Sequence, residues 1–270
     1  MLNTIIKGRT AAPPRLILYG MEGIGKSTFG ANFPAPIFVQ TEDGLGNIDC
    51  ERFPLATSFM DVLEQLVALQ TEKHDYKTVV LDSLDWLERL IWDKVALDAK
   101  VDSIESIGYG RGYTIALNHW RKVLDITTKL RSNGMIVLFL AHAVAEDYTD
   151  PEVTGLKRFT PRLHKTARSL LSEYVDLILL ATRKFGAANG SENNPRIVRT
   201  EATPYQVAKS RYNIPPELPL DAAAVLDAIR ASVRTNSTNH SDEPKETEPN
   251  DERRRLERKI NKGLELARPN

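Results

Sequence analysis

Residues 20–27 read G-M-E-G-I-G-K-S, a set of residue types that can hold phosphate groups. Glycines let backbone N–H groups wrap a phosphate, Lys26 can reach the outer phosphates, and Ser27 can ligate Mg²⁺. An apolar run precedes this loop and a helical segment follows, so the phosphates would also meet a helix N-terminus. The alternative is a glycine turn with an idle lysine. We predict an ATP site with Mg²⁺ formed by Gly20, Glu22, Gly23, Ile24, Gly25, Lys26, Ser27 and Thr28.

Polar side chains also follow three other apolar runs. Asp82 ends one run and is placed to hold Mg²⁺ through water, together with Ser27, although it could instead cap the next helix. Glu42 follows a second run, where it could polarise an attacking water as a general base. His142 follows a third and could sense the terminal phosphate, but histidines are also common on surfaces after strands. No N-K-x-D element for guanine recognition occurs in the sequence.

These side chains need a common scaffold, which the hydrophobic pattern supplies. Apolar runs alternate with helical stretches, and this pattern predicts an α/β fold with a mainly parallel sheet and helices on both faces. The carboxyl ends of parallel strands meet at one edge, where the polar residues would gather. Segments 195–202 and 205–211 are expected to pair antiparallel before a helix at 220–233. The expected strands are 15–19, 36–41, 78–82, 135–141 and 177–182, and the expected helices are 58–72, 83–99 and 114–134.

Length and composition indicate one packed domain. The 270 residues are 41% hydrophobic, enough for a single substantial core, which we place at 1–233. Residues 234–251 are polar and rich in Asn, Ser, Thr, Glu and Pro, so we expect a disordered linker. Residues 252–270 form a basic tail that is either a solvated charged segment or a docking helix for a partner.

Charge and cysteine content exclude several protein classes. The formal net charge is zero, so a nucleic-acid contact would need a local basic patch. Cys50 stands alone, which excludes an internal disulfide or a cysteine-based zinc site. The sequence has no signal peptide and no apolar run of about 18 residues, so we expect a cytoplasmic protein without a membrane segment.

From Gly20 to Arg211 the sequence resembles the RecA superfamily of P-loop ATPases. F-V-Q-T-E-D-G-L resembles the strand ending in that family's catalytic glutamate, and T-V-V-L-D-S resembles its magnesium aspartate. V-A-K-S-R-Y-N-I-P-P-E resembles the late strand whose basic residues reach a neighbouring subunit's ATP. The resemblance implies a RecA-type fold, an oligomeric ring or filament with ATP at subunit interfaces, and catalytic roles for Glu42, Lys26, His142, Lys209 and Arg211. Family members usually carry glutamine where His142 stands.

The resemblance also implies two loops that face single-stranded DNA. The first spans 103–113, and the second follows His142; aromatic rings would stack on bases and cations would neutralise phosphates. The alternative is an ordinary solvated loop and a charged helix face. The DNA-binding residues expected from these segments are Tyr109, Arg111, Tyr113, Lys157, Arg158, Phe159, Arg162 and Lys165.

A bare core with G-x-x-G-x-G-K-S-T, T-E-D-G-L and Y-G-R-G-Y is similar to short phage nucleotide-binding proteins of the Sak-type single-strand annealing and recombination group. The resemblance implies a DNA-stimulated, Mg²⁺-dependent ATPase that promotes annealing or strand exchange in the cytoplasm of a host cell. Its implied partners are single-stranded DNA, further copies of itself, and a single-strand-binding or replication protein at the tail. Two alternatives remain: a helicase or translocase motor, and a non-hydrolysing loading module that recruits a partner.

Overall fold

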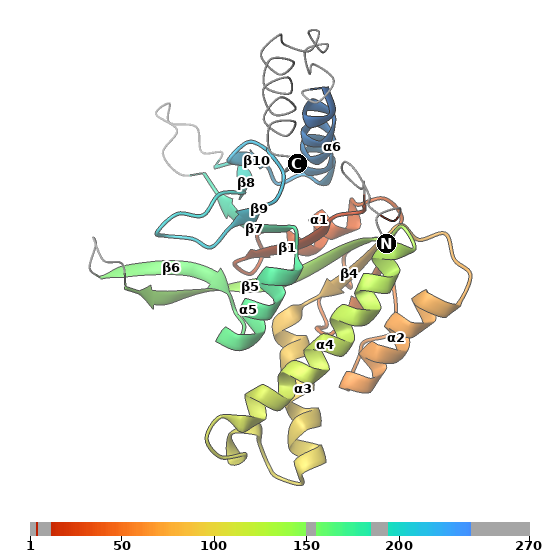
Figure 1. Cartoon of the computed structure of the whole chain (residues 1–270), viewed down its shortest axis with the longest axis vertical. Helices are drawn as coiled ribbons and strands as arrows, with labels where there is room; N and C mark the ends of the chain where they lie inside the picture. The colour runs from red at the N-terminus through yellow and green to blue at the C-terminus, as the bar shows by residue number, and fades with distance from the viewer. Residues whose placement is uncertain (1–3, 5–11, 150–154, 185–193, 239–270) are drawn as a thin grey trace, which may run out of the picture. The chain divides into compact units, whose positions relative to one another are not determined.

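The computed structural model describes Thr4 and residues 12–149, 155–184 and 194–238 (Figure 1). The chain divides into two compact units, Met1–Ser232 and Val233–Asn270, and in the second unit only helical residues 233–238 are described. The expected linker at 234–251 begins too early, because residues 234–238 continue the helix that starts at Ala222. The rest of that linker and the expected tail at 252–270 lie outside the described residues. No helix in the described ranges is long and apolar enough to cross a membrane.

A mainly parallel sheet forms the centre of the first unit, which confirms the predicted α/β class. Its strands run in the order β10-β8-β7-β1-β5-β4-β2-β3. The near-continuous apolar runs fill the central positions because both of their faces are covered. The parallel strands are β1 (Arg15–Gly20), β2 (Pro36–Gln40), β3 (Glu51–Arg52), β4 (Thr78–Asp82), β5 (Ile136–Tyr148) and β7 (Leu177–Arg183).

The late strands do not pair as the sequence pattern predicted. β8 (Arg196–Arg199) and β9 (Lys209–Ser210) do not pair with each other, because each pairs antiparallel with a different part of β7. β9 joins the beginning of β7, β8 joins its end, and β10 (Glu217–Pro219) continues the sheet beyond β8. One strand edge therefore accommodates two short segments.

The strand expected to end before His142 is also longer than predicted. β5 continues to Tyr148, and β6 (Leu156–Pro161) folds back against it as an antiparallel hairpin that projects from the sheet (Figure 1). Opposite charges face each other across this pair, with Glu146 opposite Arg158 and Asp147 opposite Lys157. Such cross-strand pairs stabilise a ladder, so regular strands replace much of the loop that the sequence suggested.

Helices cover both faces of the sheet, as predicted. Side chains from α2, α3, α4 and α5 pack on the face that carries Ile17 and Tyr19, whereas those from α1 and α6 pack on the face of Leu16 and Leu18. α4 begins three residues earlier than expected, at Arg111. The helices are α1 (Lys26–Ala31), α2 (Phe59–Thr71), α3 (Leu84–Ala99), η2 (a 3₁₀ turn, Ile104–Ser106), α4 (Arg111–Ser132), α5 (Lys165–Tyr174) and α6 (Ala222–Thr238).

A buried carboxylate ties together the sheet edge where β1 and β7 begin. The side chain of Asp176 is only 6% exposed. It forms ion pairs with Arg15 at 2.9 Å, Arg131 at 3.4 Å and Arg211 at 2.9 Å. Burial alone would raise the pKa of Asp176, but the hydrogen bonds and charge of Arg15, with the charge of Arg131, hold this pKa below its usual value.

We expect Asp176→Asn to lower the free energy of unfolding by about 2–4 kcal/mol at pH 7, because it leaves the arginines without their anion. A carboxyl group whose folded pKa is depressed stabilises the fold above its unfolded pKa, about 3.9. The difference between variant and wild type should therefore shrink as the pH falls through the folded pKa, and urea unfolding across pH 3–7 measures it. Asp227→Asn on α6 is the control, because Asp227 is 70% exposed. Equal losses in the two variants would contradict this account.

Candidate functional site

The loop after β1 is shaped by two glycine positions. Gly20 is the last residue of β1, in register with His142 of β5, and a Cβ there would lie 2.7 Å from the carbonyl oxygen of Ala181. Gly25 has a φ of 109°, and a Cβ there would lie 2.9 Å from Nη1 of Arg196. The first position needs glycine for close packing and the second for its left-handed backbone.

Lys26 lies inside this loop with only 7% of its surface exposed. Its Nζ donates hydrogen bonds to the carbonyl oxygens of Gly20 and Met21, both at 3.2 Å. Burial lowers the pKa of Lys26, while the negative charges of Asp82 and Glu22 oppose that change. A buried ammonium group whose hydrogen bonds go to neutral carbonyls suits an incoming phosphate anion.

Ser27 and Asp82 join the loop to β4. Ser27 Oγ donates a 2.6 Å hydrogen bond to Oδ2 of Asp82, which is 8% exposed. Burial raises the pKa of Asp82; the Ser27 hydrogen bond opposes this shift and the nearby charge of Glu42 adds to it. A hydroxyl beside a carboxylate whose negative charge is not fully balanced fits Mg²⁺. The remaining ligands of the ion would be waters and nucleotide phosphates.

Glu42 is held over the same space from the neighbouring strand. Its Oε2 accepts a 3.1 Å hydrogen bond from Ser83 Oγ and lies 3.9 Å from Nδ1 of His142. The hydroxyl of Thr41 donates to the Ser83 carbonyl at 2.7 Å and accepts from the Ser83 N–H at 3.0 Å, so the ends of β2 and β4 are locked together. The Glu42 side chain is 32% exposed, which leaves it accessible to a water.

Asp85, which the sequence analysis did not single out, connects this site to the β5–β6 hairpin. It accepts from the backbone N–H of His142 at 3.1 Å, lies 3.0 Å from the Nδ1 of that residue, and accepts from Arg162 Nη2 at 2.7 Å. Burial alone would raise the pKa of Asp85, but the hydrogen bonds from His142 and Arg162 hold it far below its usual range. Arg162 Nη1 also lies 3.6 Å from Glu22 of the phosphate loop.

A cleft of about 380 Å³ collects most of the predicted nucleotide-site residues. Ile24 is different, because its side chain is buried in the core on the α1 face. Arg196, the first residue of β8, also lines the cleft, and sequence reasoning missed it because nothing near it in the chain carries a phosphate-site pattern. The lining residues from the prediction are Glu22, Gly23, Gly25, Lys26, Ser27, Thr28, Glu42, Asp82 and His142.

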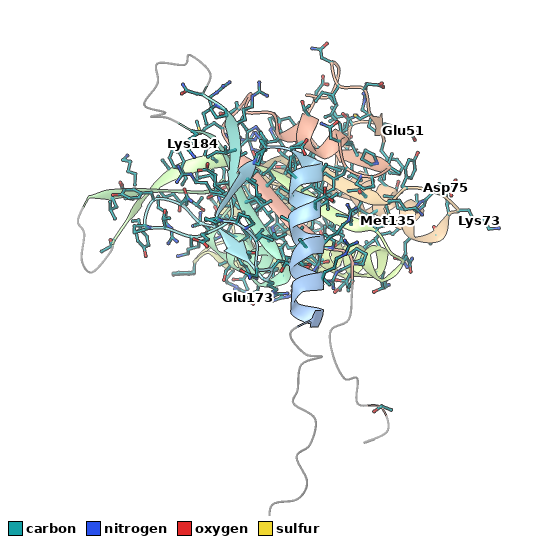
Figure 2. The ribbon with its side chains drawn as sticks, turned by 90° about the horizontal axis from the view of Figure 1, so that it is seen from above. Glu51, Lys73, Asp75, Met135, Glu173 and Lys184 are labelled. Atoms are coloured by element: carbon teal, nitrogen blue, oxygen red, sulfur yellow. The ribbon has the colours of Figure 1, made fainter. Side chains whose placement is uncertain are left out.

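In the folded chain, Lys209 and Arg211 lie far from this cleft. They adjoin the beginning of β7, whereas the phosphate loop adjoins its end. Figure 2 shows this separation, with Glu173 just before β7 and Lys184 just after it on opposite sides of the domain. Lys209 Nζ donates to the carbonyls of Ser172 at 2.6 Å and Val175 at 2.9 Å, and Arg211 pairs with Asp176. These contacts hold the end of α5.

The first predicted DNA segment is more ordered than a glycine loop. Tyr109 is fully exposed at a φ of 58°, and Arg111 is exposed at the start of α4. The ring of Tyr113 stacks on His164 at 4.1 Å, and its hydroxyl donates to Glu105 at 3.0 Å. Tyr113 therefore already has a stacking partner within the chain.

The second predicted DNA segment forms β6 and the start of α5. Lys157 and Phe159 point to one face of the hairpin with exposed side chains, and the guanidinium of Arg158 lies over the ring of Tyr148 at 4.6 Å. Lys165 is exposed at the first residue of α5. Arg162 is the member of this set that contacts the nucleotide cleft, through Glu22.

Comparison with known proteins gives a match over most of this structure. A family model described as an AAA domain matches residues 12–212, which is more than half of the chain and includes the phosphate loop, β4 and the β5–β6 hairpin. No curated protein matches the sequence.

We expect Asp82→Asn to separate stability from ligand binding. Because burial raises the pKa of Asp82, its ionised form costs stability at neutral pH, and the asparagine should raise the Tm of the unliganded protein by about 2 °C. The same change should abolish the increase in Tm that MgATP produces, because it weakens the metal site. Thermal unfolding with and without MgATP measures both effects.

Asp93→Asn on the exposed side of α3 is the matched control and should keep the wild-type response to MgATP. An Asp82→Asn variant stabilised by MgATP as strongly as the wild type would remove Asp82 from the metal site.

Proposed function

The chain belongs to the AAA domain family, and we propose that it is a RecA-type, Mg²⁺-dependent ATPase whose turnover is coupled to single-stranded DNA. The Ser27–Asp82 hydrogen bond carries this proposal, because it joins a hydroxyl and a carboxylate, ligand types that Mg²⁺ prefers, in the cleft that Lys26 also lines. Family membership by itself indicates a nucleotide-binding ATPase domain. The RecA type, the coupling to DNA and the tasks of the individual residues are what we propose beyond that.

Each residue around the cleft has a distinct task in this proposal. Lys26 neutralises the outer phosphates, while Ser27 and Asp82 hold the metal ion directly and through water. Glu42 orients the attacking water and accepts its proton, since its carboxylate is fixed by Ser83 yet accessible. Bound MgATP supplies the phosphoanhydride bond and the charge of the metal ion.

Coupling to DNA is supported by the Asp85 contacts. His142 lies between Glu42 and Asp85, and Arg162 at the base of β6 bonds the same carboxylate. Binding of a DNA strand at the hairpin or at the first predicted DNA segment would shift this connected set of hydrogen bonds. The residues that would hold the DNA are Lys157, Arg158 and Phe159 on β6, together with Tyr109, Arg111, Tyr113 and Lys165. DNA binding at the hairpin would then change the position of Glu42 in the nucleotide cleft, and ATP binding would change the hairpin in return, as allosteric coupling requires.

Lys209 and Arg211 favour action in an oligomer. They lie at the sheet edge opposite the phosphate loop of their own chain, so they could contact only the ATP of another subunit. Their present partners at the end of α5 would be exchanged for phosphate oxygens. We therefore propose a ring or filament with ATP between subunits.

The biological role that fits these parts is annealing or strand exchange in homologous recombination, as in the Sak-type phage group, in the cytoplasm of a host cell. Within this proposal the basic tail recruits a single-strand-binding or replication protein. Neither role needs a membrane contact.

Steady-state ATP hydrolysis with and without single-stranded DNA, at two salt concentrations, tests the proposal. We expect stimulation that weakens at the higher salt concentration, because phosphate contacts release counterions. Glu42→Gln should lower kcat by about 100-fold or more. Arg111→Ala should reduce the stimulation but keep the basal rate, and Arg121→Ala, an exposed arginine on the same helix, is its control.

A wild-type protein that hydrolyses ATP without any response to DNA would overturn the coupling. Tight ATP binding without turnover would instead favour the loading module, and processive duplex unwinding would favour a helicase motor.

A further inference from the structure

A second hollow of about 640 Å³ lies beside the phosphate loop, between the end of β7, strand β6 and the turn at 203–206. Three of the nine large apolar side chains that are exposed among the described residues line it: Met21, Phe159 and Tyr205, at 52, 39 and 60% exposure. Arg183 and Arg199 line the same hollow. We call this set of five residues the arginine–aromatic groove.

Tyr205 is presented on a rigid turn. The backbones of Thr203 and Gln206 exchange hydrogen bonds at 3.1 and 3.2 Å, which closes a tight two-residue loop. The Phe159 N–H donates to the Tyr205 carbonyl at 2.8 Å, and the Val207 N–H donates to the Phe159 carbonyl at 2.9 Å. The turn is thus fastened to β6, so the backbone that carries the exposed ring is already ordered before a flat ligand stacks on it.

The cations of the groove are not neutralised within it. Among the described residues, Arg199 has no side-chain hydrogen bond or ion pair, and the Nη1 of Arg183 reaches only the Asn194 carbonyl at 3.3 Å. Glu22 lines the same hollow, but its carboxylate faces Arg162 at 3.6 Å. The groove therefore combines unpaired positive charge with exposed rings.

From this combination we infer that the arginine–aromatic groove binds single-stranded DNA, with bases stacked on Phe159 and Tyr205 and phosphates on Arg183 and Arg199. A single strand alternates flat apolar bases with anions, which is the chemistry that this surface complements. The inference rests on the proposed function and adds Tyr205, Arg183 and Arg199 to the residues expected from the sequence.

Tyr19 links the groove to the nucleotide site. Its hydroxyl donates to the carbonyl of Val207 at 2.5 Å and lies 3.1 Å from the carbonyl of Phe159, and burial raises the pKa of Tyr19, which keeps the donor proton in place. Tyr19 directly precedes Gly20, the first residue of the phosphate loop. Single-stranded DNA in the groove would therefore press on the backbone of Phe159 and Val207. This backbone is hydrogen-bonded to Tyr19 on β1, the β-strand that leads into the phosphate loop.

Fluorescence anisotropy with labelled oligo-dT, in the presence of MgATP and at two salt concentrations, tests the groove. Tyr205→Ala should raise the Kd about tenfold through loss of one stacked base, whereas Tyr205→Phe should keep the wild-type Kd. Arg199→Gln should also lower the slope of log K against log salt by about 0.7, as expected for one lost phosphate contact. Leu97→Ala and Arg230→Gln are the controls; they change exposed side chains elsewhere and should have no effect.

The outcomes separate the inference from the function on which it rests. A wild-type protein that does not bind oligo-dT would refute the proposed function. Normal wild-type binding with unchanged affinity in both groove variants would refute the groove alone. If sedimentation shows that these variants lose an oligomer while their affinity for oligo-dT is unchanged, the groove is a contact between copies of the chain, and the inference is wrong.

Discussion

The hydrogen bond from Ser27 to Asp82 is the interaction on which the site depends. It exists because β1, β5 and β4 are adjacent and parallel, with Gly20 level with His142 and Asp82 level with Leu140. That register brings the phosphate loop and the Asp82 carboxylate to one edge of the sheet. The fold retains a buried carboxylate whose ionisation is costly, which is typical of a functional site rather than of optimised stability.

Around that bond, the structure uses buried charge in two different ways. At the beginning of the strands, Asp176 has three arginine partners and stabilises the domain. At the ends of the strands, Asp85 collects His142 and Arg162 and so connects the nucleotide cleft to the β5–β6 hairpin. The Tyr19 hydroxyl provides a second connection, to Phe159 on β6 and to Val207 directly after the 203–206 turn. Both connections are short and built from hydrogen bonds, and the proposed coupling between cleft and hairpin would act through them.

The sequence predicted the parts of this structure that are encoded locally. The phosphate loop has a fixed glycine spacing, and the central strands have continuous apolar runs, so the α/β fold and the position of Asp82 at a strand end followed from pattern. The hairpin was missed because the end of β5 and strand β6 carry charged residues and lack a long continuous apolar run. Asp85, Arg196 and Tyr205 were missed because their partners are distant in the chain, and only the folded register brings them together.

The most direct test of the central claim is the equilibrium affinity of the full chain for ATP, measured by calorimetry with Mg²⁺ and with a chelator. If Ser27 and Asp82 form a metal site next to the phosphates, Mg²⁺ should tighten ATP binding by about tenfold or more. Equal affinity with and without Mg²⁺ would contradict the account, because the paired hydroxyl and carboxylate would then have no metal to hold.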